Sequence, residues 1–302
     1  MMRNEFFYPS RDGVTQIHAV EWIPEGEPVG ILQICHGMVE HIYRYDEFAS
    51  FIASKGFYVV GHDHLGHGQS IVSKEKLGYF RHPDGNEVVL SDIQQLRVRT
   101  QEKYPKLPYF MMGHSMGSFL LRQYLGLYSG GLAGAIIMGT GNQPSAILVG
   151  GMAICKVISM FKGWEYRSKF VNGMAVGSYQ KKMGRGWLTK DVAIQEKYSK
   201  DPFCGFIFTV NAYFHMFRGM FRMNMQEKAG KASKTLPLFF VAGAEDPVGE
   251  SGKGVEKVVK HYRDSGYQSV QMKLYPNDRH EILNELDKEV VFQDILNFLR
   301  GN

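Results

Sequence analysis

The stretch FMMGHSMGSFLLRQYL at residues 110–125 contains a G-x-S-x-G pentapeptide between an apolar run and a helical pattern. Residues 109–112 are continuously apolar, as in a strand buried on both faces, and residues 116–127 carry apolar side chains three or four positions apart. A strand, a sharp turn and a helix are the context in which this pentapeptide holds a strained, exposed serine. Glycines on both sides of that serine avoid the Cβ atoms that would crowd the turn. Ser115 is therefore predicted to be a nucleophile.

Other apolar runs predict the sheet to which this turn belongs. Strands that alternate with helices indicate a doubly wound α/β fold, with a mostly parallel central sheet and helices on both faces. An alternating segment at 15–22 fits an antiparallel strand that pairs with residues 6–8. The remaining predicted strands lie at 29–34, 57–60, 135–138, 238–241 and 270–274, and the remaining predicted helices at 45–55, 89–104, 253–265 and 287–299.

The alternation of strands and helices stops between residues 142 and 234, where the spacing is helical throughout. We expect an inserted helical cap there, on a core formed by residues 1–141 and 235–302. Residues 151–228 hold 13 Lys and Arg against 5 Asp and Glu, and they are rich in Met and aromatic side chains. Such a segment could face acyl chains, anionic head groups or a membrane surface. A helical subdomain with a solvated basic face is an equally good interpretation.

The composition is that of an ordinary globular protein. The chain has 302 residues, 44% of them hydrophobic and 22% charged, with a net charge of +5. No apolar leader stands at the N-terminus, and no uncharged apolar stretch is long enough to predict a transmembrane helix. The three cysteines are too few and too scattered for a disulfide framework or a metal site, so we expect a cytoplasmic protein. No nucleic-acid-binding motif accompanies the basic charge.

A serine hydroxyl needs a base and an orienting acid, which follow such an elbow in the order acid, then histidine. Asp246 lies in the loop after the predicted strand 238–241, and we prefer it to Glu245 because the following Pro247 fixes the loop. A simple turn-starting Asp-Pro is the alternative. His280 follows the last predicted strand and would take the serine proton. His261, the other histidine after Asp246, falls within a predicted surface helix.

Backbone N–H groups should stabilise the negative oxygen that develops during attack on a carbonyl. One donor should be the residue after the nucleophile, Met116, and the other should come from the loop after an early strand. The sequence HGMVEH at 36–41 is that loop, which makes Met38 the expected second donor. Gly37 would let the backbone approach closely.

These segments together resemble the serine α/β hydrolases of the monoacylglycerol lipase and lysophospholipase group. The resemblance implies the triad Ser115, Asp246 and His280, the oxyanion donors Met38 and Met116, and a helical cap over an acyl pocket. It also implies hydrolysis of monoacyl esters without a cofactor. Met38 departs from the smaller residue that is common there, and the cap has no matching motif. The segments that carry the resemblance are 36–41 with Arg44 and Tyr45, 61–70, 113–118, 243–249 and 279–285.

Three alternatives compete with a lipid esterase. The H-x-H-x-x-H spacing of His62, His64 and His67 is similar to a zinc motif, but Gly66 stands where that motif needs an acid. A non-catalytic ligand receptor of the same fold is a second alternative, although such proteins often lack a triad member. A short-chain or aromatic-acid esterase, a thioesterase or a peptidase would share the triad and differ only in the cap. The residues favour a cytoplasmic serine ester hydrolase that needs neither metal nor cofactor.

Overall fold

The computed structural model describes residues 1–302, apart from the side chains of Ser178, Gln180, Lys182 and Arg185. Its centre is an eight-stranded sheet in the order β1-β2-β4-β3-β5-β6-β7-β8. β1 and β2 form an antiparallel hairpin and β2 is antiparallel to β4, whereas all pairs from β4 to β8 are parallel. The strands are β1 (Met2–Pro9), β2 (Gln16–Ile23), β3 (Gly30–Cys35), β4 (Phe57–His62), β5 (Tyr109–His114), β6 (Gly134–Met138), β7 (Leu238–Gly243) and β8 (Val270–Tyr275).

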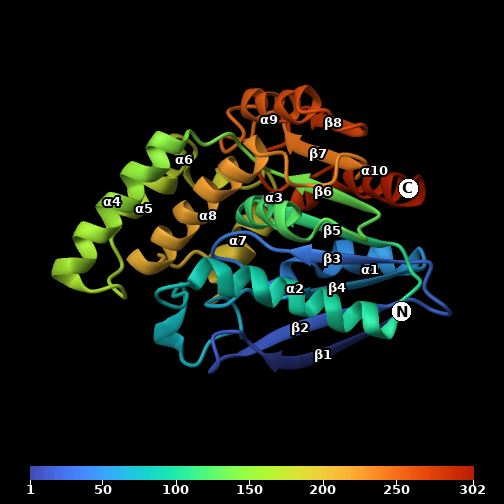
Figure 1. Cartoon of the computed structure of the whole chain (residues 1–302), viewed down its shortest axis with the longest axis horizontal. Coiled ribbons are helices and arrows are strands. Elements are labelled where there is room, and N and C mark those ends of the chain that lie inside the picture. The colour runs from blue at the N-terminus through green and yellow to red at the C-terminus, as the bar shows by residue number, and fades with distance from the viewer.

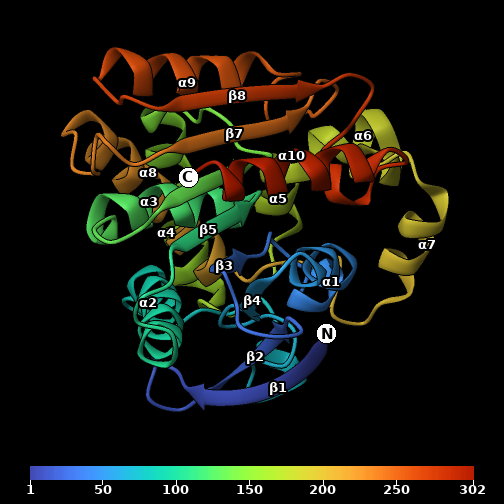
Figure 2. The same cartoon turned by 90° about the vertical axis from the view of Figure 1, so that its right-hand side faces the viewer.

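Helices cover both faces of the sheet, which confirms the predicted fold class (Figure 1, Figure 2). Successive residues of β5 show why: Tyr109 and Met111 pack into one apolar cluster with α2, α3 and α9, whereas Phe110 and Met112 pack into another with α1 and α10. A strand buried on both faces has no polar side, hence its continuous apolar sequence. These helices are α1 (Asp46–Ser54), α2 (Gly85–Lys103), α3 (Met116–Tyr128), α9 (Lys253–Asp264) and α10 (Lys288–Arg300).

The chain between β6 and β7 contains only helices among its regular elements. We call residues 142–234 the helical insertion, and Figure 1 shows α4, α5, α6 and α8 grouped beside the ends of the strands. Gly151 permits a close approach of α4 to α8, because a Cβ there would lie 2.9 Å from the ring of Phe217. The helices are α4 (Ser145–Lys162), α5 (Lys169–Asn172), α6 (Ser178–Met183), α7 (Val192–Lys200) and α8 (Val210–Lys228).

α4 differs from the other helices in its surroundings. It is long and apolar enough to cross a membrane by length and composition, yet only 11% of it is buried. Lys156 and Lys162 interrupt its apolar run, so no membrane-spanning helix was expected here from the sequence. A core helix of the same composition would be largely buried, so α4 presents apolar side chains to the outside of the molecule.

Candidate active site

Ser115 occupies the sharp turn between β5 and α3. Its backbone has φ 52° and ψ −119°, in the region that side chains other than glycine rarely adopt. A Cβ at Gly113 would lie 2.3 Å from the carbonyl oxygen of Gly117, and a Cβ at Gly117 would lie 2.1 Å from that of Cys35. Any side chain at either position would therefore clash with these carbonyl oxygens, so both positions require glycine. The Ser115 N–H donates to the Met138 carbonyl oxygen at 3.0 Å, which ties the strained turn to β6.

The predicted acid and histidine meet at the same end of the sheet. Asp246 follows β7 and His280 follows β8, and the carboxyl ends of neighbouring parallel strands lie side by side. His280 Nδ1 is 3.0 Å from each carboxylate oxygen of Asp246, and both side chains are buried. The Val248 N–H also donates to Asp246 Oδ1 at 2.9 Å, so the carboxylate is held from two sides.

Glu245 is directed elsewhere. Its side chain is 42% exposed and forms ion pairs with Lys190 at 2.9 Å and with Arg279 at 3.7 Å. The preference for Asp246 over Glu245 thus agrees with the geometry. His261 lies on α9, as the sequence indicated, and stacks at an angle beside Tyr262.

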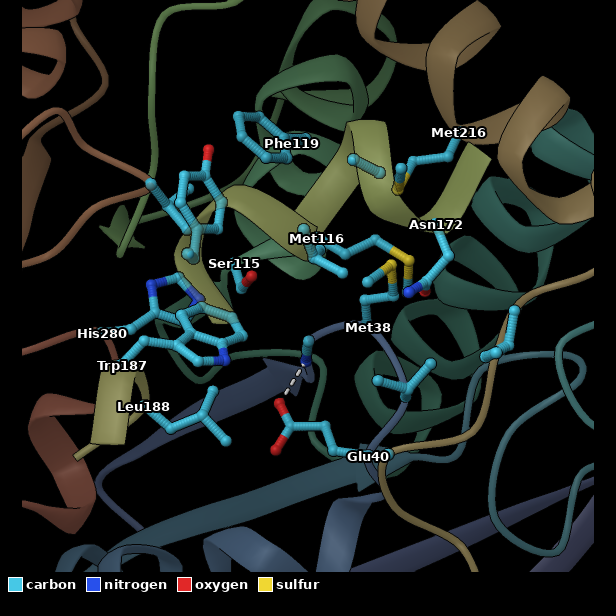
Figure 3. Close-up of a pocket in the computed structure, with 18 of the residues that line it drawn as sticks. Met38, Glu40, Ser115, Met116, Phe119, Asn172, Trp187, Leu188, Met216 and His280 are labelled. Atoms are coloured by element: carbon cyan, nitrogen blue, oxygen red, sulfur yellow. Dashed lines mark hydrogen bonds between the residues drawn. The ribbon is translucent and has the colours of Figure 1, made fainter. Parts of the chain in front are cut away.

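The other ring nitrogen of His280, Nε2, is buried and has no hydrogen-bond partner among the described residues. Ser115 Oγ, whose proton His280 is expected to take, forms no hydrogen bond to this nitrogen, although both side chains face one cavity (Figure 3). The indole of Trp187 stacks on the imidazole with ring centroids 5.1 Å apart, which fixes the ring plane. An imidazole oriented by a carboxylate, with its second nitrogen unoccupied, is suited to accept a proton from a hydroxyl.

Met38 and Met116 both line this cavity, and their backbone N–H groups have no acceptor among the described residues. Two unpaired N–H groups beside a serine are the arrangement that an oxyanion hole requires. Gly37 makes the approach possible, because a Cβ there would lie 2.6 Å from Glu40 Oε1 and 3.2 Å from Ser115 Cβ. Donors from the backbone would not depend on the methionine side chain, so the unusual Met38 is compatible with the expected role.

A buried ion network supports this loop, and the sequence analysis assigned it no role. Glu40 Oε1 accepts from the Gly37 N–H at 2.6 Å and from the Tyr45 hydroxyl at 2.8 Å, and Glu40 Oε2 accepts from Arg44 at 2.6 Å. Arg44 also binds both carboxylate oxygens of Glu281, at 2.6 and 2.5 Å. Burial raises the pKa of Glu40, but Arg44, His114 and His36 together outweigh this effect, and the pKa lies well below its usual value. The network therefore links the loop at residues 36–41, which we call the oxyanion loop, to Glu281, the residue after His280.

His114 forms a second link between the same loops. Its Nε2 lies 3.2 Å from the His280 carbonyl oxygen, and its Nδ1 lies 3.0 Å from the Tyr45 hydroxyl and 3.4 Å from Glu40 Oε1. Because a carbonyl only accepts, the Nε2 carries the proton. Burial lowers the pKa of His114, but its hydrogen bond to Glu40 and the negative charges of Glu40 and Glu281 together outweigh this effect, and the pKa is raised. His114, the residue before Ser115 in the pentapeptide, thus helps to fix the position of the loop that contains His280.

The H-x-H-x-x-H segment braces the core, and its described residues do not converge as metal ligands. His62 Nε2 is 3.1 Å from His64 Nδ1, and Asp63 accepts from the Ile42 N–H at 2.8 Å and from His18 at 2.9 Å. Burial lowers the pKa of His62 and of His67 to about 3. Neutral, buried rings tied to the segment after the oxyanion loop give this motif a structural role.

The cavity in front of Ser115 has a volume of about 950 Å³. It lies between the carboxyl ends of the strands and the helical insertion, and Figure 3 shows Met38, Met116, Phe119 and Met216 around the serine. Its wall is mainly apolar. The apolar residues that the insertion contributes include Ile147, Leu148, Ile154, Met174, Trp187, Leu188, Phe206, Met216, Phe217 and Met220.

The sequence model of the serine aminopeptidase S33 family, a group of hydrolases, matches residues 26–287 of this chain. The chain belongs to this family. Family membership and the fold agree with the resemblance seen in the sequence: the protein is a serine α/β hydrolase similar to monoacylglycerol lipases.

Two relatives illustrate the extent of that similarity. The monoacylglycerol lipase of Mycolicibacterium smegmatis is 26% identical over 304 residues, which cover 98% of this chain and 97% of the relative. The monoglyceride lipase of Mus musculus is 26% identical over 276 residues, with 88% of this chain and 80% of the relative covered.

A solved structure is similar along the whole chain. The thermostable carboxyl esterase from Bacillus coagulans, determined in complex with glycerol, is 28% identical and superposes with a TM-score of 0.91 over 100% of this chain and 99% of its own. The substrate-analog complex of a Saccharomyces cerevisiae monoglyceride lipase, at 19% identity, has a TM-score of 0.79 over 99% of this chain and 95% of its own, and shows the shared fold.

Proposed function

We propose that this protein hydrolyses monoacyl lipid esters through an acyl-enzyme on Ser115. The observation that carries the proposal is the Asp246–His280 pair, whose free Nε2 faces the same apolar cavity as the strained serine. A charged or polar substrate would gain little from such walls, whereas each buried methylene contributes about 0.8 kcal/mol. The similarity to monoacylglycerol lipases supports the same substrate class.

The reaction follows from the positions of these groups. Ser115 Oγ attacks the ester carbonyl carbon while its proton passes to His280 Nε2, and Asp246 stabilises the imidazolium that forms. The Met38 and Met116 N–H groups hold the negative oxygen of the tetrahedral intermediate. The C–O bond then breaks, and the leaving alcohol takes the proton from His280. A water molecule repeats the sequence on the acyl-enzyme, which releases the fatty acid and restores the serine.

Peptide hydrolysis would fit the family description but not the charges of the cavity. An aminopeptidase must hold a positively charged amine, for which an unpaired carboxylate is the natural partner. The two acidic residues among the described lining residues are Glu40 and Glu281, and Arg44 already pairs with both. We therefore infer that esters, and not N-terminal peptides, are the preferred substrates.

We infer that the helical insertion also contacts lipid surfaces transiently. Met160 and Phe161 at the end of α4 are 74% and 80% exposed, and Lys156 and Lys162 stand beside them in the sequence. Exposed apolar side chains next to basic ones bind the interface of anionic bilayers. The M160S/F161S protein should sediment less with vesicles that contain phosphatidylglycerol and should hydrolyse a soluble short ester at the unchanged rate. Equal sedimentation of both proteins would refute this contact.

The substrate preference can be tested with p-nitrophenyl esters whose acyl chains have two to sixteen carbons, together with a monoacylglycerol and a lysophospholipid. We expect kcat/KM to rise with chain length and to disappear in Ser115→Ala. Ser159→Ala, which removes an exposed serine hydroxyl on α4, is the matched control and should retain full activity. Serine-dependent turnover confined to short or aromatic esters would keep the mechanism and discard the lipid substrate. No turnover by the wild-type protein would favour a ligand receptor.

A further inference from the structure

Three metal-binding side chains from distant segments meet outside the proposed triad. His41 ends the loop at residues 36–41, whereas Asp201 and Cys204 lie between α7 and α8. Their nitrogen, oxygen and sulfur donor atoms all lie within 4.8 Å of one another, and this is the one such group of three among the described residues. His41 Nε2 is 2.8 Å from Asp201 Oδ2, and both side chains remain partly exposed, so an ion from water can reach them.

We propose that His41, Asp201 and Cys204 bind a zinc ion, with a water molecule as the fourth ligand. Imidazole, carboxylate and thiolate are the three donor types that zinc takes in proteins, at roughly 2.0–2.3 Å. Donors arranged tetrahedrally at those lengths are separated by roughly 3.3–3.7 Å. The separation of His41 Nε2 and Asp201 Oδ2 must therefore widen from 2.8 Å, whereas any donor pair near the 4.8 Å limit must approach by about 1 Å. The sulfur donor distinguishes this site from one for magnesium or calcium, which prefer oxygen alone.

The charges around the site suit a divalent ion. Zinc replaces the hydrogen bond between His41 and Asp201, and the thiol proton of Cys204 leaves to solvent as the Zn–S bond forms. One carboxylate and one thiolate then neutralise the two positive charges of the metal. Arg44, whose charge acts on Asp201 and Cys204, is already bound by Glu40 and Glu281, so its charge is compensated within its own network.

The position of the site suggests what the metal does. The Gly205 N–H donates to the Val39 carbonyl oxygen at 3.0 Å, and the Tyr198 hydroxyl donates to the same oxygen at 3.2 Å. Cys204, Gly205 and Val39 all line the cavity. Zinc therefore fastens the helical insertion to the oxyanion loop at the cavity wall, and we expect it to slow ester hydrolysis reversibly. This effect on activity rests on the proposed function, whereas the binding of the metal does not.

Cobalt and zinc titrations of the chelator-treated full-length protein test the site. Cobalt should give a thiolate-to-metal charge-transfer band at one equivalent, and saturating zinc should raise Tm by several degrees, because a ligand that binds only the folded state stabilises it. Cys204→Ser and His41→Gln should lose both responses. Cys155→Ser and His261→Gln, which change a thiol and an imidazole elsewhere, should retain them. Absence of the band from the wild-type protein, or its persistence in Cys204→Ser, would overturn the proposal.

An activity assay separates this inference from the proposed function. Zinc should lower kcat/KM of the wild-type protein about tenfold, with recovery on addition of EDTA, and should leave Cys204→Ser unaffected. If the protein hydrolyses no ester, the cobalt spectrum still decides whether the site exists. If it hydrolyses esters but shows no charge-transfer band, the proposed function stands and the zinc site falls.

Discussion

The loops at the carboxyl ends of the strands bury polar side chains, whereas α4 of the helical insertion exposes apolar ones. Around Ser115 the polar groups are buried, and Asp246, Glu40 and Arg44 each have several fixed partners. On α4, by contrast, large apolar side chains such as Phe161 are exposed. The first region is built to hold a few atoms in one geometry, whereas the second is built to meet a variable apolar partner. Under the proposed function, the first region would perform the chemistry and the second would meet the lipid.

Loss of the nucleophile or the base should separate the two regions most sharply. Ser115→Ala and His280→Ala are each expected to lower kcat roughly 10⁴- to 10⁶-fold, because triad members act as a unit. Binding of the long-chain substrate should change little, since the apolar walls are intact. Steady-state kinetics and equilibrium binding of a non-hydrolysable ether analogue provide the measurement. A Ser115→Ala protein with more than a hundredth of the wild-type activity would show that another group performs the chemistry.

The acid gives the next largest effect. Asp246→Asn should reduce kcat roughly 10³- to 10⁴-fold, because an amide can hold the imidazole in the wrong tautomer and does not stabilise its positive charge. Glu245→Gln is the matched control in the adjacent residue, and it should stay within about threefold of the wild type since its carboxylate points to Lys190 and Arg279. A larger loss of kcat in Glu245→Gln than in Asp246→Asn would identify Glu245 as the acid.

Arg44 tests the support beneath the loops. Arg44→Met leaves Glu40 and Glu281 as uncompensated buried charges, which should cost about 3–5 kcal/mol of unfolding free energy. Activity should fall with it, because Glu40 no longer fixes the Gly37 N–H. The triple change R44M/E40Q/E281Q removes the stranded charges and should recover part of the stability. Urea unfolding curves measure both, and an Arg44→Met protein as stable as the wild type would deny the network its structural role.

These residues also mark how far the sequence could predict the site. The placement of Ser115, Asp246 and His280 at one end of the sheet was predictable, because each lies in a loop directly after a strand and the carboxyl ends of parallel strands converge. The ion pair between Arg44 and Glu281 was not, because 237 residues separate them and no local pattern states which distant charges will meet. The two lysines of α4 hid its apolar character. The periodicity of a helix follows from its own sequence, whereas its surroundings depend on the rest of the fold.

A lower pH should destabilise the protein through its buried histidines, with a smaller effect than the substitutions above. Burial lowers the pKa of His62 and of His67 from 6.5 to about 3, so the unfolded chain takes up protons at higher pH than the folded protein. The stability that the neutral rings contribute is complete above pH 6.5 and is lost as the pH falls toward 3. At pH 5 the loss is about 2 kcal/mol for each ring.

Guanidinium midpoints between about pH 7.5 and pH 5 measure this dependence. His261→Gln, which removes an imidazole from α9 and leaves the buried rings in place, should show the same decline as the wild type. A midpoint that does not change over this range would mean that these rings bind protons equally in the folded and unfolded protein, so that burial does not lower their pKa.

Mass spectrometry of the acyl-enzyme tests the central claim most directly. The protein is mixed with a p-nitrophenyl ester of a long fatty acid, quenched in acid during the first turnover, digested and analysed. We expect the acyl mass on the peptide that contains Ser115 and its absence from Ser115→Ala. Turnover without an adduct on that peptide, or an adduct on another residue, would contradict it.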